Sequence, residues 1–469
     1  MKILVCCADW GVPLCGSAGS SVHLRALAKA LSDLGHEVRL VVSNADGDAL
    51  PSLPVDVVAP ARVWPAVHGC IERLRGREGG LAALWIPTRT FVEPVPAAPA
   101  GSGARTVCRE PEAATSWKTR LYYDTLPWLA DRAQECVSHP VRFGRAVSRI
   151  MADFRPDAVY ERYALCQTGV ARALRPAAGR RVPHLLEVNA ALSRERFDGV
   201  AGAAALGRWS ALVERRLWRG ADRVVCVSEK LRGQAVSAGV EPARVLVMPN
   251  GVDLEAFSPD RPKGRLRKRL GLGPETRLIG WLGALSPGRG GEAFVRLLAR
   301  ALPRIGQAMG VVIGGGPLEG DCRRLAAALG IADRVAFTGP VAHERVPDFL
   351  VDLDVAVACY PKRGDFYFSP MKVAEYLACG LPVVAGRTGH APELVADGEN
   401  GLLVEPDDAD AWGRALAAVC RDAALRARLG RAARQSALAG PTWRGNAERV
   451  VREIGRCWQG ASPGRRARP

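Results

Sequence analysis

The fold is decided by residues 367–385, which read Tyr-Phe-Ser-Pro-Met-Lys-Val-Ala-Glu-Tyr-Leu-Ala-Cys-Gly-Leu-Pro-Val-Val-Ala. This stretch predicts a short helix with well-defined ends, followed by a buried strand. Ser369 is a good N-cap, Pro370 suits the first helical position, and Gly380 can adopt the left-handed conformation that ends a helix. The stretch is therefore typical of one helix-to-strand unit of an α/β protein.

Two charges lie at unusual positions in this helix. Lys372 falls in the first turn, where the helix dipole disfavours a cation by about 0.3–1 kcal/mol, and Glu375 follows three residues later. A second Ser-Pro helix start, Ser286-Pro287-Gly288-Arg289, repeats the arrangement with an arginine. Helix N-termini with added cations are suited to phosphate, so we expect a phosphate group of a ligand to bind there.

Size and charge limit the classes of protein to consider. The 469 residues are too many for one ordinary domain, and 48% hydrophobic and 24% charged residues are typical of a soluble globular protein. The net charge is +17, but the arginines are scattered and no basic run is interleaved with aromatic residues. This pattern argues against nucleic acid and favours anionic small molecules or lipid headgroups as partners.

The cysteines and histidines do not form the pattern of a metal site. Most of the thirteen cysteines lie inside apolar strand or helix patterns, and none forms a Cys-x-x-Cys pair, so we expect buried thiols in a reducing compartment. The seven histidines lack helical i, i+4 partners. Because the N-terminus is unlike a signal peptide and no apolar run reaches about 18 residues, we expect a cytoplasmic protein, with peripheral contact to the inner membrane face left open.

Strand and helix patterns alternate in both halves of the chain. The predicted strands are 3–7, 37–42, 158–160, 184–188, 223–227 and 245–248 in the first half, and 278–282, 310–313, 334–337, 354–358 and 381–385 in the second. Repeated strand-helix units predict parallel sheets covered on both faces. We therefore expect an α/β protein of two doubly wound, Rossmann-like domains that face each other across a cleft.

The predicted domains are 1–255, with an irregular insertion at about 60–140, and 265–440. A polar, proline-containing segment at 258–264 is the best linker between them. In parallel sheets of this type, ligands bind beyond the carboxyl ends of the strands. The loop Gly16-Ser17-Ala18-Gly19 and both Ser-Pro sequences occupy such positions, so we expect the three to converge at the cleft.

Three motifs have weaker functional interpretations. The glycine loop lacks the full G-x-G-x-x-G spacing, and Ser43 stands where the ribose of NAD favours an acid, which argues against a dehydrogenase. Asp352-Leu353-Asp354 has the spacing of a metal-binding pair, but we favour polar residues at a helix-to-strand boundary. His23 is either a residue of the cleft or a surface histidine.

Glu375 has two interpretations. It can simply pair with Lys372, but beside a bound diphosphate a carboxylate is better suited to accept hydrogen bonds from sugar hydroxyls. The ribose of a nucleotide would supply those hydroxyls. Lys372 and Arg289 are interpreted as cations for the diphosphate, with solvated side chains as the alternative for each.

Several motifs in the right order resemble the retaining glycosyltransferases of family 4, which have the two-domain GT-B fold. The resemblance runs from Met1 to about Trp458, and it implies that a last helix, 441–458, crosses back onto the first domain. The tail, 459–469, is expected to be disordered. The motifs are Gly16 to Gly19, Met248 to Asp253, Gly283 to Gly290, Gly314 to Pro317, Ser369 to Ala385 and Gly398 to Leu403.

The resemblance implies roles for the matching residues. Glu375 would bind the nucleotide ribose, and Arg289, assisted by Lys372, would stabilise the donor diphosphate as it leaves. The other candidates for donor binding are Gly16, Gly19, Gly283, Ser286, Gly314, Tyr367, Ser369 and Pro370, and those for the acceptor or the cleft are His23, Asn189 and Asn250.

Three positions depart from the family pattern. Tyr367 replaces a glutamate that commonly contacts the donor sugar, Ala284 replaces an arginine, and Asn189 replaces a histidine near the reacting sugar. These departures concern the identity of the sugar more than the type of reaction.

The hypothesis that follows is a metal-independent retaining glycosyltransferase without a cofactor. It would move a hexose-type sugar from a nucleoside-diphosphate sugar to a hydroxyl of a glycan, a lipid-linked or a small-molecule acceptor. A GT-B nucleotide-sugar epimerase is one alternative, but the sequence shows no clear carboxylate pair for acid and base work at the sugar carbon. A non-catalytic nucleotide-sugar-binding protein is the other, motivated by the replaced glutamate and histidine.

Overall fold

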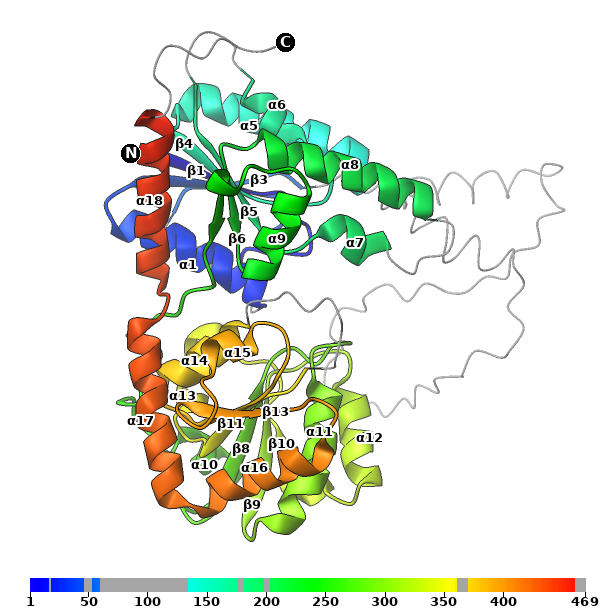
Figure 1. Ribbon diagram of the computed structural model, residues 1–469, viewed down its shortest axis with the longest axis vertical. Helices are drawn as coiled ribbons and strands as arrows, with labels where there is room; N and C mark the ends of the chain where they lie inside the picture. Colours follow the sequence, from blue (N-terminus) through cyan, green and yellow to red (C-terminus); the bar gives the residue numbers. More distant parts are fainter. Residues whose placement is uncertain are drawn as a thin grey trace, which may run out of the picture.

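A computed structural model of the chain describes residues 1–16, 18–45, 53–59, 134–175, 181–197, 203–360 and 370–459. Tyr367, Ser369, most of the predicted insertion and nearly all of the predicted tail lie outside the described residues. Each half of the chain forms one parallel sheet covered by helices, and the two halves are stacked along the long axis of the molecule (Figure 1). The predicted fold class, two doubly wound α/β domains, is confirmed.

The first sheet has seven parallel strands in the order β3-β2-β1-β4-β5-β6-β7. Its strands are β1 (Lys2–Cys7), β2 (Glu37–Val42), β3 (Val55–Val57), β4 (Ala158–Arg162), β5 (His184–Val188), β6 (Arg223–Cys226) and β7 (Val245–Val247). The helices of this half are α1 (Gly19–Asp33), α5 (His139–Phe154), α6 (Gly169–Ala173), α7 (Leu192–Phe197), α8 (Ala204–Gly220) and α9 (Glu229–Ser237).

The second sheet has six parallel strands in the order β10-β9-β8-β11-β12-β13. Its strands are β8 (Arg277–Leu282), β9 (Ala308–Ile313), β10 (Val335–Phe337), β11 (Val355–Ala358), β12 (Val383–Gly386) and β13 (Gly401–Val404). The helices are α10 (Arg265–Leu270), α11 (Gly291–Ala301), α12 (Glu319–Ala328), α13 (Val346–Leu350), α14 (Met371–Ala378), α15 (Ala391–Leu394), α16 (Ala409–Arg421) and α17 (Ala423–Ala439), with a one-turn 3₁₀ helix, η6 (His343–Arg345), before α13.

Successive side chains of β1 point to opposite faces of the first sheet. Both faces are buried, each in a separate apolar core. Val5 packs in one core with Leu27 of α1 and Val450 of α18 (Trp443–Gln459). Cys6 packs in another core with Phe143 of α5. This arrangement explains why the strands read as continuous apolar runs rather than as alternating ones.

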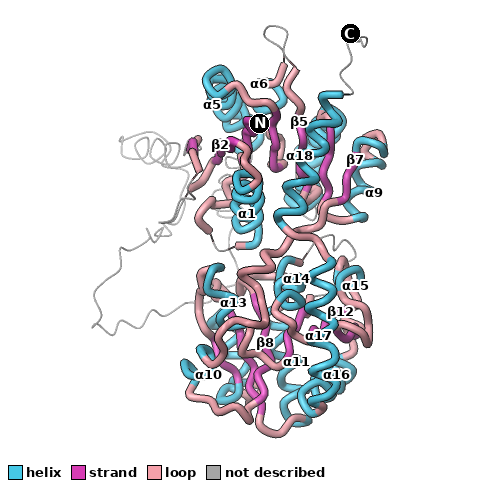
Figure 2. Tube along the Cα trace, turned by 90° about the vertical axis from the view of Figure 1, so that its left-hand side faces the viewer, coloured by secondary structure: helices cyan, strands magenta, loops and turns pink. Residues whose placement is uncertain are grey.

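The chain passes between the two halves twice. After α17 it returns to the first half as α18, which lies beside α1 in both views (Figures 1 and 2). Arg223 Nε donates to Glu453 Oε2 at 2.9 Å, and Asn446 Nδ2 donates to the carbonyl oxygen of Pro249 at 2.8 Å. No helix of the described residues is long and apolar enough to span a membrane.

The two Ser-Pro sequences have different outcomes. Helix α14 ends as predicted, since Gly380 has a φ of 67°, but it begins at Met371 with Pro370 as its N-cap, so Pro370 is not the first helical residue. The predicted helix start at Ser286-Pro287 is wrong. The Arg289 N–H donates to the Ser286 carbonyl oxygen across a turn, with Gly288 at a φ of 76°, and α11 begins only at Gly291. Proline followed by glycine favours a type II turn over a helix start.

Candidate functional site

Glycines allow the carboxyl ends of three neighbouring strands, β8, β9 and β11, to meet closely. Gly314 has a φ of 125°, and a Cβ atom there would lie 2.2 Å from the carbonyl oxygen of Gly283. Gly290 has a φ of 96°, and a Cβ atom there would lie 1.9 Å from the carbonyl oxygen of Cys359. No larger residue fits these positions unless the backbone moves, so backbone groups form much of this edge of the second sheet.

Lys372 of α14 extends across this edge as a half-buried cation. Its Nζ atom lies 4.2 Å from the ring centroid of Trp281 and 5.1 Å from that of Tyr360. The pKa of the Lys372 ammonium is lowered from 10.5 to about 8, mainly by its removal from water and in part by the charge of Arg289, while Cys359 and Glu375 act in the opposite direction. Removal from water thus outweighs the favourable influence of Glu375 on this charge.

Glu375 is also buried, with 5% of its surface exposed, and it is hydrogen-bonded. Its Oε1 atom lies 2.7 Å from Nε2 of His343 in η6. The predicted alternative of a pair with Lys372 is therefore not the contact observed, although the two charges still influence each other. His343 was not among the predicted site residues, although its position after a strand of the same sheet, Val335–Phe337, is a signal for one.

The neighbouring side chains fix the position of α14. Tyr376, one residue after Glu375, accepts a hydrogen bond at 2.7 Å from the backbone N–H of Leu282, the last residue of β8. Arg289 lies in the exposed turn before α11. Its positive charge acts to lower the pKa of both Lys372 and Tyr360. The structure thus brings the three residues predicted to act on the donor, Arg289, Lys372 and Glu375, to one edge of the second sheet.

The glycine loop of the first half lies next to this edge. Arg25 of α1 holds the loop through two hydrogen bonds from Nη1, at 2.5 Å to the carbonyl oxygen of Leu14 and at 2.7 Å to that of Gly16. The position of a Cβ atom on Gly19 would lie 3.4 Å from Sδ of Met371, the first residue of α14. The glycine loop and α14 therefore meet where the two halves of the chain face each other.

A second cluster, in the first half, surrounds the carboxylate of Glu187 in β5. His23 Nε2 lies 2.8 Å from its Oε2 atom, Tyr160 donates to the same atom at 2.5 Å, and Arg162 donates to Oε1 at 3.0 Å. Asn189 also donates to Oε1 through its side-chain amide. Burial by itself would raise the pKa of Glu187, but His23, Arg162 and Tyr160 together lower it to about 2.

The cluster includes both segments that pass between the halves. His23 Nδ1 lies 2.6 Å from Oδ1 of Asn250, in the segment after β7, and its ring packs edge-on against Trp443, at the start of α18, with 4.9 Å between centroids. His23 is 4% exposed, so its interpretation as a surface histidine is wrong. The structure brings the three cleft candidates, His23, Asn189 and Asn250, together around an acid to which sequence reasoning gave no role.

Asp352 and Asp354 have structural partners. Asp352 accepts backbone hydrogen bonds at the start of α10, including one of 2.6 Å from Leu266. Asp354 pairs with Arg267 at 2.9 Å and with Arg277 at 3.0 Å. These contacts support the interpretation of the pair as polar residues at a helix-to-strand boundary.

Comparison with known protein families identifies the class. Residues 18–251 match the family described as "Glycosyl transferase 4-like domain", and residues 276–422 match "Glycosyl transferases group 1". The two matches together cover most of the chain. The protein therefore belongs to glycosyltransferase family 4, with the GT-B fold formed by its two parallel sheets.

Individual relatives are about one third identical to the chain over the matched part of their sequences. The chain is 34% identical over 241 residues to a GDP-mannose-dependent alpha-(1-6)-phosphatidylinositol monomannoside mannosyltransferase of Mycolicibacterium smegmatis. This matched region covers 50% of the chain and 63% of the relative. The chain is also 37% identical over 199 residues to a D-inositol 3-phosphate glycosyltransferase of Stackebrandtia nassauensis. Here the matched region covers 40% of the chain and 44% of the relative. The matched parts thus span 63% and 44% of these two relatives, less than two thirds of either.

Solved structures show the same fold at lower identity. A sucrose-phosphate synthase of Thermosynechococcus elongatus superimposes with a TM-score of 0.66 at 19% identity, over 98% of this chain and 100% of that one. Anabaena HepE in complex with UDP superimposes with a TM-score of 0.65 at 17% identity, over 97% and 100%. None of these four proteins is named as an epimerase, so the epimerase alternative has no support among them.

Proposed function

We propose that the protein is a retaining glycosyltransferase that moves a sugar from a nucleoside-diphosphate sugar to a hydroxyl group of an acceptor. The observation that carries the proposal is the half-buried ammonium of Lys372, placed over the rings of Trp281 and Tyr360 in the same helix as the buried carboxylate of Glu375, at the strand ends of a family 4 chain. A diphosphate supplies negative charge for the ammonium, and a ribose supplies hydroxyl donors for the carboxylate.

The donor would lie where the two halves of the chain face each other. Lys372 and Arg289 bind the diphosphate, aided by backbone groups near Gly283 and by the glycine loop of the first half. Glu375 keeps one oxygen on His343 at 2.7 Å and accepts the ribose hydroxyls with the other. His343 thereby holds the carboxylate in one orientation, which is its proposed positioning role.

The reaction needs no nucleophile from the protein. The bond between the anomeric carbon and the diphosphate oxygen breaks, and the diphosphate leaves with the electron pair. The acceptor hydroxyl forms the new bond on the same face of the sugar, and its proton passes to the departing diphosphate. Arg289 and Lys372 stabilise the charge that develops on the leaving group, so protein cations take the role that a metal ion has in metal-dependent transferases.

The first half would bind the acceptor near the cluster of His23, Glu187, Asn189 and Asn250. The names of two relatives mention inositol-containing acceptors, a phosphatidylinositol monomannoside and D-inositol 3-phosphate. We therefore propose a hydroxyl of a phosphorylated polyol or of a lipid-linked glycan as the first acceptor to test. A lipid-linked acceptor would place the protein in peripheral contact with the inner membrane face.

A nucleotide screen followed by a turnover assay tests the proposal. Thermal unfolding is measured with UDP, GDP, ADP and TDP, and the best nucleotide is then supplied as its sugar conjugates, with detection of released nucleoside diphosphate and of product stereochemistry. We expect one nucleotide to raise the melting temperature and its sugar conjugate to turn over with retention. Binding without turnover would favour the non-catalytic alternative, and a changed sugar without an acceptor would favour the epimerase.

A further inference from the structure

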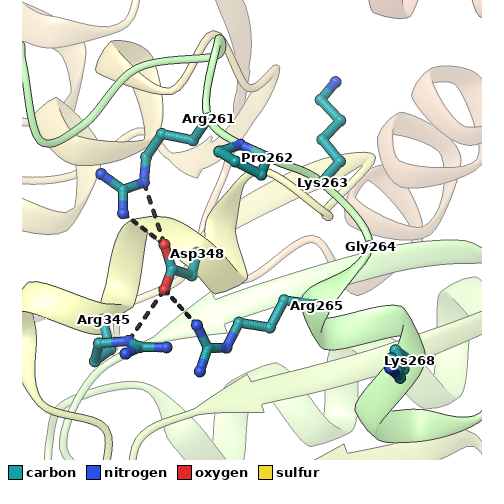
Figure 3. Close-up of a pocket in the computed structure, with 8 residues that line it drawn as sticks. All are labelled: Arg261, Pro262, Lys263, Gly264, Arg265, Lys268, Arg345 and Asp348. Atoms are coloured by element: carbon teal, nitrogen blue, oxygen red, sulfur yellow. Dashed lines mark hydrogen bonds and ion pairs between the residues drawn. The ribbon is translucent and has the colours of Figure 1, made fainter.

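A cavity of about 620 Å³ lies on the second half of the chain, and its described lining residues include none of those assigned to the donor (Figure 3). It is formed by α10 with the segment that leads into it, and by η6 and α13. Among the described residues, five cationic side chains and one carboxylate line it, namely Arg261, Lys263, Arg265, Lys268, Arg345 and Asp348.

Three of the cations converge on Asp348, which is the centre of the cluster in Figure 3. Arg261 Nη2 lies 2.6 Å from Oδ1, whereas Arg345 Nε at 3.0 Å and Arg265 Nη1 at 3.2 Å share Oδ2. One ion pair would be enough to attach the linker segment to α13. The second and third guanidinium groups therefore exceed what anchoring alone requires.

Neither of the two remaining cations, Lys263 and Lys268, has a counter-charge among the residues that the structure describes. No described residue accepts a hydrogen bond from the ammonium group of Lys263 or of Lys268, and Lys263 extends away from Asp348 (Figure 3). The lining thus carries five positive charges and one negative charge. Like charges around one concave surface repel each other, and an anion with more than one charge relieves that repulsion.

We propose that this cavity is a second anion site, which binds a multiply charged phosphate ester. The planar forks of Arg265 and Arg345 each donate only one hydrogen bond to Asp348, which leaves donors in the geometry that phosphate oxygens accept. The volume lies in the range of sites for small molecules, about 300–1,000 Å³. The ligand is either a free phosphorylated metabolite or the phosphorylated headgroup of a membrane lipid, and the experiment separates these sources.

The cavity is linked to the donor residues through η6. Arg345, the last residue of this single turn, reaches the cavity, while His343, the first residue, contacts Glu375 at 2.7 Å. A ligand that draws Arg345 away from Asp348 would shift the turn that orients Glu375. We infer that occupancy of the cavity alters nucleotide affinity, and this second part alone rests on the proposed function.

Binding is tested with two probes at physiological ionic strength. The soluble probe is inositol hexakisphosphate in calorimetry, and the membrane probe is sedimentation with vesicles of phosphatidylcholine and phosphatidylinositol 4-phosphate. The cavity variant is Lys263→Ala/Lys268→Ala, which breaks no ion pair of the described residues. The control variant, Arg324→Ala/Arg414→Ala, removes the same charge from exposed positions on α12 and α16.

We expect the cavity variant to bind at least about tenfold more weakly than the wild type, and the control variant to bind almost unchanged. Loss confined to the soluble probe identifies a metabolite, and loss confined to vesicles identifies a lipid headgroup. Absence of binding by the wild type, or an equal loss in both variants, overturns the site.

The link to η6 is tested separately, by measuring nucleotide affinity with and without the probe that binds. Unchanged affinity while the probe stays bound overturns the link and leaves the site intact.

Discussion

Lys372→Met is expected to stabilise the protein while weakening the binding of the nucleotide. Burial lowers the pKa of Lys372 from 10.5 to about 8, so keeping its charge in the folded protein at neutral pH costs about 3 kcal/mol. Contact of the ammonium with the faces of Trp281 and Tyr360 offsets about 0.5–2 kcal/mol of that free energy. Methionine fills the same space without the charge, so the free energy of unfolding should rise by about 1–3 kcal/mol.

The pH dependence of stability follows from the direction of the shift. Because the pKa of Lys372 is lower in the folded than in the unfolded protein, the unfolded state binds more protons between about pH 8 and 10.5. The stability of the wild type should therefore rise relative to that of Lys372→Met as the pH increases through this window. The two proteins should be closest in stability above it.

The same substitution should reduce nucleotide affinity by roughly 10- to 100-fold, since a charge-assisted hydrogen bond to the diphosphate is lost. A bound diphosphate raises the pKa of Lys372, so the wild type should take up a proton on binding above about pH 8. Urea unfolding measures the stability, and calorimetry in buffers of different ionisation enthalpy measures the affinity and the proton uptake.

The control is Lys29→Met, which removes an exposed lysine of α1 that pairs with Asp33. It should change the free energy of unfolding by at most about 0.5 kcal/mol and leave nucleotide affinity unchanged. A Lys372→Met protein that is less stable than the wild type at neutral pH, with unchanged nucleotide affinity, would refute the reasoning.

Three further perturbations test other parts of the account. His343→Ala should lower nucleotide affinity, measured by calorimetry, by about tenfold. His343→Gln retains an N–H donor and should restore part of the affinity. Full affinity in the alanine variant would exclude a positioning role. Glu187→Gln should lower the free energy of unfolding by about 3 kcal/mol at pH 7. The pKa of Glu187 is lowered from 4.5 to about 2, so its contribution to the free energy of unfolding is present above pH 4.5 and lost as the pH falls toward 2. Urea unfolding should show the difference in stability between the wild type and Glu187→Gln shrinking in that window. A difference that stays constant with pH would be contrary to the assignment. A chelator should leave sugar transfer intact, whereas loss that Mn²⁺ restores would revive a metal role for Asp352 and Asp354.

The fold was predictable because its signals are local. Apolar runs, helix periodicity and the turn at Gly380 each depend on a few consecutive residues, and together they define the alternating strands and helices. The failure at Ser286-Pro287 has a local cause as well. Serine and proline suit both a helix start and a type II turn, and Gly288, with its φ of 76°, selects the turn.

The candidate site was predictable only in part, because its contacts join distant segments. Glu375 and Lys372 stood out through their places in one helix, but the partner of Glu375, His343, lies 32 residues away in a single turn of 3₁₀ helix. Glu187 and His23 are separated by 164 residues and meet only through the packing of α1 against the ends of the strands. Such pairs depend on how the elements pack, which no local pattern specifies.

The central claim is that Glu375 and Arg289 bind the nucleotide of the donor. Calorimetry of the best-binding nucleoside diphosphate with the wild type, Glu375→Ala and Arg289→Ala tests it most directly. We expect each variant to remain folded, to bind the nucleotide at least about tenfold more weakly and to transfer no sugar. Unchanged affinity in both folded variants would contradict it.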